Sequence, residues 1–101
     1  YNSLSSGKYK DAGNPDRALT EEEVDLFRRD LAIIHTNFIA AVAENRALPL
    51  EQVAALADAS SMLGAMALEN GLIDAIGGQK EAYAALEAQI GEEPVICWGG
   101  L

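Results

Sequence analysis

The chain has 101 residues, half of them hydrophobic, and a formal net charge of −9. This length fits one small domain with a modest core. The negative charge speaks against a nucleic acid partner, because phosphate binding requires clustered Lys and Arg. A single cysteine, Cys97, excludes an internal disulfide and offers no zinc-ligand pair, so no metal or cofactor is expected.

The charge is unevenly distributed along the chain. Residues 1–19 hold three basic and two acidic side chains, whereas residues 47–101 hold one basic side chain against eight acidic ones. The longest unbroken apolar run, residues 38–43, is far shorter than the ~20 residues of a membrane-spanning helix. Because Tyr1 is not a translation start, we expect a longer parent polypeptide, and any membrane association would come through residues upstream of it.

Residues 1–19 are predicted to form a loop or a short strand. They are rich in Ser, Gly, Asn and Asp, with Pro15 in a turn-like run. The alternation Lys8, Tyr9, Lys10 would let a short strand point the two lysines to one side and the tyrosine to the other.

Residues 20–46 predict one long helix around which the rest of the chain is organised. Thr20 can cap its first turn, Glu23 can close a capping box, and Glu21 and Glu22 suit the positive helix start. Apolar residues recur at alternating three- and four-residue steps along one face: Val24, Phe27, Leu31, Ile34, Phe38 and Ala41. Such a helix is roughly 40 Å long, so we expect part of this face to pack on something other than the domain's own core.

The remainder, within residues 20–101, predicts a helical portion of one domain with a short strand near its end. Three shorter helices are expected at residues 49–58, 64–70 and 79–89, with Pro49 in the first turn of the earliest. Gly71 can take the left-handed position that ends the second of these. The apolar residues of 94–98 favour a short strand. The fold class is therefore mainly α with one or two short strands.

Two stretches carry a family resemblance. The first is Ser6-Gly7-Lys8-Tyr9-Lys10-Asp11, followed by Pro15, Arg17 and Thr20-Glu21-Glu22-Glu23. The second is Leu56-Ala57-Asp58, Gly64 and Ala67, followed by Gly71-Leu72-Ile73-Asp74 and Gly77. In this order and at this separation they resemble the signal peptide peptidase A family, the S49 serine peptidases. The resemblance covers roughly residues 6–85 and implies a C-terminal fragment of a ClpP/crotonase-like α/β domain.

The resemblance implies a Ser-Lys dyad in which Lys10, and not Lys8, is the general base. A lysine acts as a base only when it is neutral, which requires burial or nearby positive charge that an assembled complex could supply. A serine hydroxyl would attack the peptide carbonyl, while Lys10 takes the hydroxyl proton and returns it to the leaving amine.

The family's nucleophile lies in a Gly-rich segment upstream of the lysine, so we expect it outside this chain. Ser3, Ser5 and Ser6 are too close to Lys10 in sequence to be that serine. Ser60 and Ser61 stand where the family has a Gly-Arg-hydrophobic run and are interpreted as residues of a helix break. The serine would come from an upstream segment or from another subunit of a homo-oligomer, and this chain alone would be inactive.

Other interpretations remain open for the same residues. Lys10 can be a solvated loop lysine, and Asp11 beside it is a candidate orienting residue. His35 is expected to be packed or hydrogen-bonded rather than catalytic, and Cys97 is expected in a buried strand. The competing functions are a non-catalytic helical assembly module derived from the family and, ranked last, an acidic adaptor that binds a basic partner through residues 47–101.

Overall fold

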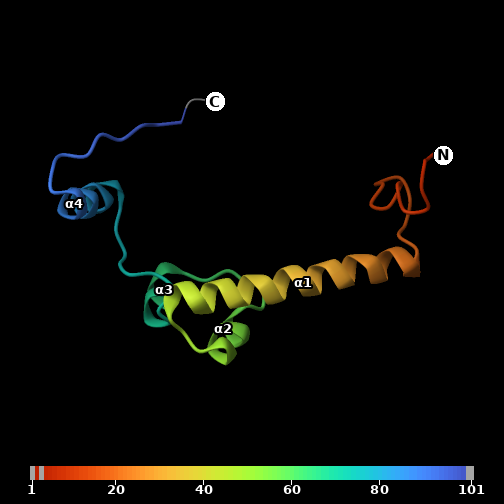
Figure 1. Ribbon diagram of the computed structural model, residues 1–101, viewed down its shortest axis with the longest axis horizontal. Helices are drawn as coiled ribbons and strands as arrows, with labels where there is room; N and C mark the ends of the chain where they lie inside the picture. The colour runs from red at the N-terminus through yellow and green to blue at the C-terminus, as the bar shows by residue number, and fades with distance from the viewer. Residues whose placement is uncertain (1, 3, 100–101) are drawn as a thin grey trace. The chain divides into compact units, whose positions relative to one another are not determined.

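The structure is a computed structural model that describes residue 2 and residues 4–99. Ser3 and the outermost residues of the predicted ranges 1–19 and 20–101 lie outside the described residues. The chain divides into two compact units, Tyr1–Ala59 and Ser60–Leu101, each of which is described by itself. Four helices follow one another within the described residues, as Figure 1 shows: α1 (Glu21–Arg46), α2 (Leu50–Leu56), α3 (Gly64–Glu69) and α4 (Gln79–Ile90).

The capping box predicted for the long helix is present at the start of α1. The Thr20 hydroxyl accepts a hydrogen bond from the Glu23 amide at 3.2 Å, and the Glu23 carboxylate accepts one from the Thr20 amide at 3.0 Å. Two amide groups that would otherwise lack helical partners are thereby satisfied. At the other end, Ala47 takes the left-handed conformation with φ 52°, and its amide donates to carbonyls of the last turn.

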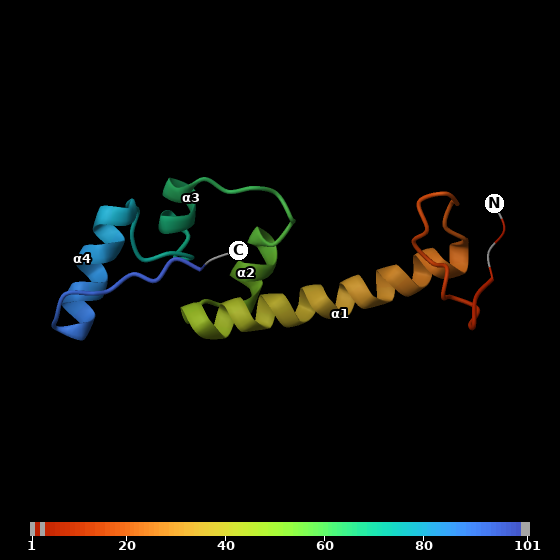
Figure 2. The ribbon, with the colours of Figure 1, turned by 90° about the horizontal axis from the view of Figure 1, so that it is seen from above.

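Helix α2 lies against the C-terminal half of α1 in both ribbon views (Figures 1 and 2). Val53 of α2 is only 2% exposed and is the one buried hydrophobic residue among those described. Ile39 and Val42 on α1 are half-buried. The His35 ring nitrogen Nε2 lies 2.7 Å from the carbonyl oxygen of Ala57, which links α1 to the residue that ends α2.

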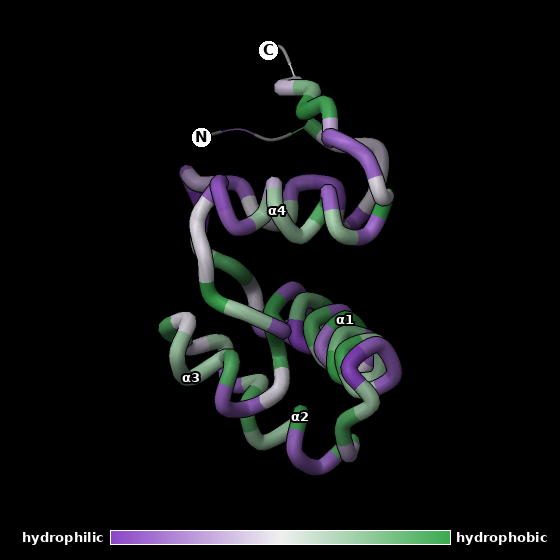
Figure 3. Tube along the Cα trace, turned by 90° about the vertical axis from the view of Figure 1, so that its left-hand side faces the viewer, coloured by the Kyte–Doolittle hydropathy of each residue, from purple (hydrophilic) through white to green (hydrophobic). Residues whose placement is uncertain are grey.

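The predicted apolar face of α1 exists but is largely uncovered. Hydrophobic and hydrophilic positions alternate around this helix in Figure 3. Leu31 and Ile34 are each 63% exposed, and Phe38 is 59% exposed. This agrees with the expectation that a helix of 26 residues is longer than its own domain needs.

The second unit contains the two remaining helices, each ended by a left-handed glycine. Gly71 has φ 76° after α3, as predicted, and Gly91 has φ 75° after α4. Before α4, the Glu81 carboxylate accepts a hydrogen bond from the Gly78 amide at 2.9 Å. A Cβ atom on Gly77 would lie 2.6 Å from the Glu81 Cβ, so the chain can pass this close only with a glycine there.

The predicted strands are absent from the described residues. Residues 6–13 form consecutive turns and bends, and residues 94–98 carry no regular secondary structure. A strand requires a hydrogen-bonded neighbour, and no described segment pairs with either stretch. The expectation that Cys97 is buried in a strand is wrong for this chain, because its thiol is exposed.

The cap of α1 can be tested by replacing Thr20. Thr20→Ala removes the acceptor of the Glu23 amide and should destabilise the helix start by about 1 kcal/mol. Amide hydrogen exchange at Glu23 and Val24 should then accelerate, whereas Thr20→Ser should restore protection. Equal exchange rates in Thr20→Ala and in the unaltered chain would contradict the role of the hydroxyl.

Candidate active-site loop

The residues that precede α1 form a loop of consecutive turns, here called the lysine loop (residues 7–19). Backbone amides donate to carbonyls three residues earlier, at Lys10 to Gly7 (3.2 Å), Ala12 to Tyr9 (3.1 Å), Asn14 to Asp11 (3.2 Å) and Arg17 to Asn14 (3.3 Å). The Asn14 side chain also accepts from the Asp16 amide at 2.8 Å, which is the turn-forming contact typical of asparagine. The short strand considered for Lys8 to Lys10 is thus replaced by turns.

All five guanidinium N–H groups of Arg17 donate hydrogen bonds, two of them to Glu23 at the start of α1 and three within the lysine loop. Its Nε donates to Asp11 Oδ2 at 3.3 Å, and its Nη2 donates to the Asp11 carbonyl at 3.0 Å. Its two terminal nitrogens donate hydrogen bonds to the Glu23 carboxylate at 3.0 and 2.8 Å. Nη1 also donates to the Ala18 carbonyl at 3.1 Å. No other side chain carries five donors in this fixed geometry, so lysine could not replace it.

Glu23 is the buried partner of this contact, with 5% of its surface exposed. Its carboxylate accepts from Arg17 and from the Thr20 amide, so it joins the loop and the helix cap. The Arg17 hydrogen bonds, followed by that of Thr20, lower the pKa of Glu23 below its ordinary range. Reciprocally, Glu23 and then Asp11 raise the pKa of Arg17.

The neighbouring carboxylate, Glu22, holds the other part of the loop. Its Oε2 atom lies 2.7 Å from Lys8 Nζ and accepts from the Tyr9 hydroxyl at 3.2 Å. The Lys8 ammonium also lies 5.3 Å from the centre of the Tyr9 ring, within the range of a cation–π contact. The hydrogen bond with Glu22 raises the pKa of Lys8 and lowers that of Glu22. Because both groups are exposed, the pair itself adds little stability.

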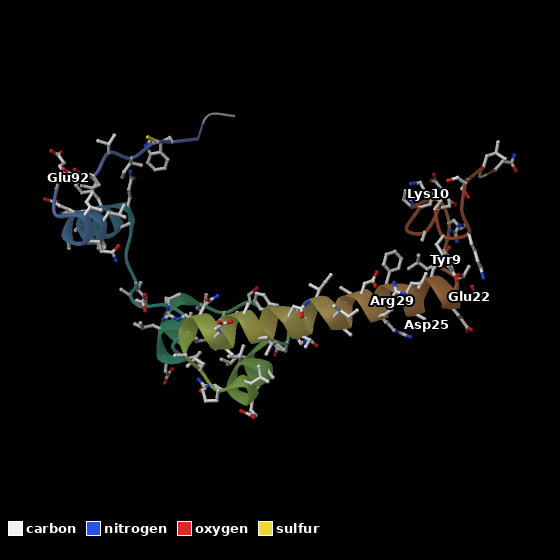
Figure 4. The ribbon with its side chains drawn as sticks, viewed as in Figure 1. Tyr9, Lys10, Glu22, Asp25, Arg29 and Glu92 are labelled. Atoms are coloured by element: carbon white, nitrogen blue, oxygen red, sulfur yellow. The ribbon has the colours of Figure 1, made fainter. Side chains whose placement is uncertain are left out.

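Lys10, the predicted base, is exposed in this chain. In Figure 4 it stands at the edge of the loop away from the start of α1, where Tyr9 and Glu22 lie together. The ion pairs found among residues 4–99 do not include it. Ser5, earlier in the same segment, donates its hydroxyl to the Gly7 carbonyl at 3.2 Å. The catalytic assignment of Lys10 therefore stays a prediction.

The side chains that hold the loop differ from those that the sequence singles out. Asp11 is a candidate orienting partner of Lys10 in the sequence, but its carboxylate accepts from Arg17 and from the side-chain amide of Asn14 at 2.9 Å. In the sequence, Arg17 stands out only as part of the family motif, and Glu22 only as an acidic residue at a helix start. The available signal was an arginine six residues after Asp11 and six before a capping glutamate.

Neither a metal site nor a membrane-spanning helix is found in the part of the chain that the structure describes. No group of three or more His, Cys, Asp or Glu side chains is placed there to hold a metal ion. None of its helices is both long enough and apolar enough to cross a bilayer.

Comparison with known proteins identifies the family. The model of peptidase family S49 matches residues 1–92, which include the whole lysine loop and all four helices. The chain belongs to peptidase family S49.

Curated relatives of this family are similar along most of the chain. The "Putative protease MJ0651" of Methanocaldococcus jannaschii is 31% identical over 95% of this chain and 32% of its own length. The "Putative signal peptide peptidase SppA" of Enterococcus faecium is 32% identical over 83% of the chain and 24% of its own length. The "Serine protease SPPA, chloroplastic" of Arabidopsis thaliana is 33% identical over 80% of the chain and 12% of its own length. The chain thus spans about a third or less of these S49 relatives.

The contacts of Arg17 can be tested with a substitution that keeps the positive charge but removes the planar arrangement of five N–H donors. Arg17→Lys leaves a cation but offers three donors on one nitrogen, so the contacts to Asp11 and Glu23 cannot all be kept. Hydrogen exchange at the Lys10, Ala12 and Asn14 amides should accelerate on the order of tenfold. Arg28→Lys, on the exposed surface of α1, is the matched control and should leave these rates unchanged. Unchanged loop exchange in Arg17→Lys would show that the loop is held by other contacts.

The depressed pKa of Glu23 predicts how the loop responds to acid. Because its folded-state pKa lies below the ordinary value of 4.5, the stabilisation is complete above that pH and is lost as the pH falls through the folded-state pKa. The Thr20 amide proton, which donates to Glu23, should report this step in an NMR titration. In Arg17→Lys the midpoint should rise towards 4.5, and an identical midpoint in both proteins would contradict the assigned cause.

Proposed function

We propose that this chain supplies Lys10 as the general base of a serine-type S49 peptidase that hydrolyses peptide bonds with a Ser-Lys dyad. Family membership supports the peptidase class, and the relatives bear names of proteases, one of them a serine protease. The nucleophilic serine would come from an upstream segment of the same protein or from another subunit of a homo-oligomer. The substrate is a peptide or protein, and the 101-residue chain by itself is inactive.

In the proposed reaction, Lys10 moves one proton in each direction. The serine hydroxyl attacks the carbonyl carbon of the substrate while Lys10 accepts the hydroxyl proton. Collapse of the tetrahedral intermediate breaks the C–N bond, and Lys10 returns the proton to the leaving amine. Water, activated by the same base, then attacks the acyl-enzyme, and the serine is released. Because Lys10 is exposed in this chain, the surroundings that keep it neutral would be supplied by the assembled enzyme.

The observation that carries the choice of Lys10 is the different surroundings of the two loop lysines. Lys8 lies 2.7 Å from the Glu22 carboxylate, and this contact raises its pKa. A lysine held in its charged form is a poor base. Lys10 stands at the other edge of the loop, where a serine brought by the rest of the enzyme could approach it.

The exposed face of α1 supports a second part of the proposal, which is that these helices also serve assembly. The exposed side chains of this face together form an apolar surface, unlike apolar residues exposed singly; they are Leu31, Ile34 and Phe38. In the proposed enzyme this surface packs within the oligomer. The same surface favours the competing function, a helical assembly module of the family without chemistry of its own.

Replacing Lys10 separates the two functions. Lys10→Arg in the whole protein keeps the positive charge but cannot be deprotonated. Cleavage of a peptide substrate should fall by about 10²- to 10⁴-fold, the range for loss of a general base. Labelling of the serine by a fluorophosphonate should slow in parallel, while the oligomer size by light scattering should not change.

Two further lysines provide the comparison for this experiment. Lys80→Arg, in α4, controls for the substitution itself and should cleave normally. Lys8→Arg keeps a cation opposite Glu22 and should retain most of the cleavage. Full cleavage by Lys10→Arg would remove Lys10 from the mechanism, and combined with loss in Lys8→Arg it would assign the base to Lys8. A protein that assembles but neither cleaves nor reacts with the probe would be the assembly module.

A further inference from the structure

Lys10 lies between two anchored parts of the lysine loop, and both anchors are carboxylates of the first turn of α1. Before it in the sequence, Lys8 and Tyr9 both bind the Glu22 carboxylate. After it, Asp11 binds Arg17, which in turn binds Glu23. Lys10 is therefore the residue at which two independently held segments meet.

We propose that Glu22 is a positioning residue for Lys10: by binding Lys8 and Tyr9 through one oxygen, it fixes the turn that presents Lys10 to the nucleophile. The inference rests on the proposed function of Lys10 and extends it to a residue outside the dyad. Glu22 itself touches no reacting atom. Its effect is exerted through the backbone of Tyr9 and through the turn that joins the Lys10 amide to the Gly7 carbonyl.

The surroundings of Glu22 separate this role from a role in stability. Its side chain is 62% exposed, so its removal leaves no cavity. The capping box uses Glu23, and Glu21 supplies a second negative charge to the same helix start. Exposed ion pairs contribute little to the free energy of unfolding. Glu22 therefore acts mainly on the conformation of the lysine loop and not on the free energy of unfolding.

The contact with Tyr9 fixes the side of the loop on which Lys10 lies. The Tyr9 hydroxyl reaches a residue 13 positions later, which ties this turn directly to α1. With Tyr9 and Lys8 drawn to the helix start, Lys10 is presented at the opposite edge, as Figure 4 shows for Tyr9, Lys10 and Glu22. Without the contact, the turn could rotate and carry the Lys10 amine away from the serine. A misplacement of about 1 Å in a catalytic group can reduce a rate by ~10²-fold.

The test compares Glu22→Ala with its neighbour Glu21→Ala in the whole, assembled protein. Glu22→Ala should lower kcat by about tenfold or more, with KM and the thermal midpoint nearly unchanged. It should also slow fluorophosphonate labelling of the serine. Glu21→Ala removes the same charge from the same helix turn, so it should behave as the unaltered protein. Equal kcat values in the two variants would overturn the inference.

Two additional variants test whether Glu22 affects kcat through its contacts with Tyr9 and Lys8. Glu22→Gln keeps an oxygen that can accept from both Tyr9 and Lys8, so it should recover most of the rate lost in Glu22→Ala. Tyr9→Phe deletes one hydroxyl and should lower kcat without unfolding the chain, which keeps the test valid if Glu22→Ala is poorly folded. A rate for Glu22→Gln as low as that of Glu22→Ala, together with an unaffected Tyr9→Phe, would overturn the inference.

A double variant separates failure of this inference from failure of the proposed function. If Glu22 acts through Lys10, adding Glu22→Ala to Lys10→Arg should leave the small residual rate unchanged. A further fall in that rate would mean that Glu22 acts by another route, which overturns the inference. Full cleavage by Lys10→Arg alone would instead overturn the proposed function. Loss in Lys10→Arg with normal kcat in Glu22→Ala would overturn only the positioning role.

Discussion

The five hydrogen bonds of the Arg17 guanidinium are the contact on which the first unit depends. They satisfy the buried carboxylate of Glu23, which would otherwise be a costly charge to bury, and they draw Asp11 onto the same group. Because Glu23 also binds the Thr20 amide, one carboxylate serves the helix cap and the loop together. The start of α1 and the lysine loop are therefore a single structural element rather than a helix with a loop attached.

Helix α1 divides into three zones along its length. Its first turn carries the loop, its C-terminal half packs against α2 around Val53, and its middle presents Leu31, Ile34 and Phe38 to the exterior. With one hydrophobic residue buried among those described, the chain gains little stability from burial by itself. This agrees with its extent, which is about a third or less of the relatives it matches. The described residues are ordered mainly by hydrogen bonds between residues close in sequence.

What the sequence could predict depended on how local the cause was. The capping box of Thr20 and Glu23 and the left-handed Gly71 were predictable, because each follows from residues three or four positions apart. The strand predicted at 94–98 is absent, since strand formation depends on a neighbour that a sequence pattern does not reveal. The contacts of Arg17 and Glu22 follow no periodicity, so the sequence pattern alone does not reveal them. The catalytic role of Lys10 stays a prediction.

The separation in sequence of the loop contacts has a consequence for the order of folding. The links from Arg17 to Asp11 and Glu23 span six residues, and the two links to Glu22, from Tyr9 and from Lys8, span 13 and 14. Closing loops this short costs little chain entropy, and local contacts form early and fast. The segment from Lys8 to Glu23 can thus reach its final conformation before contacts between residues farther apart in the sequence form. Lys10 lies within this segment, between its two anchored parts.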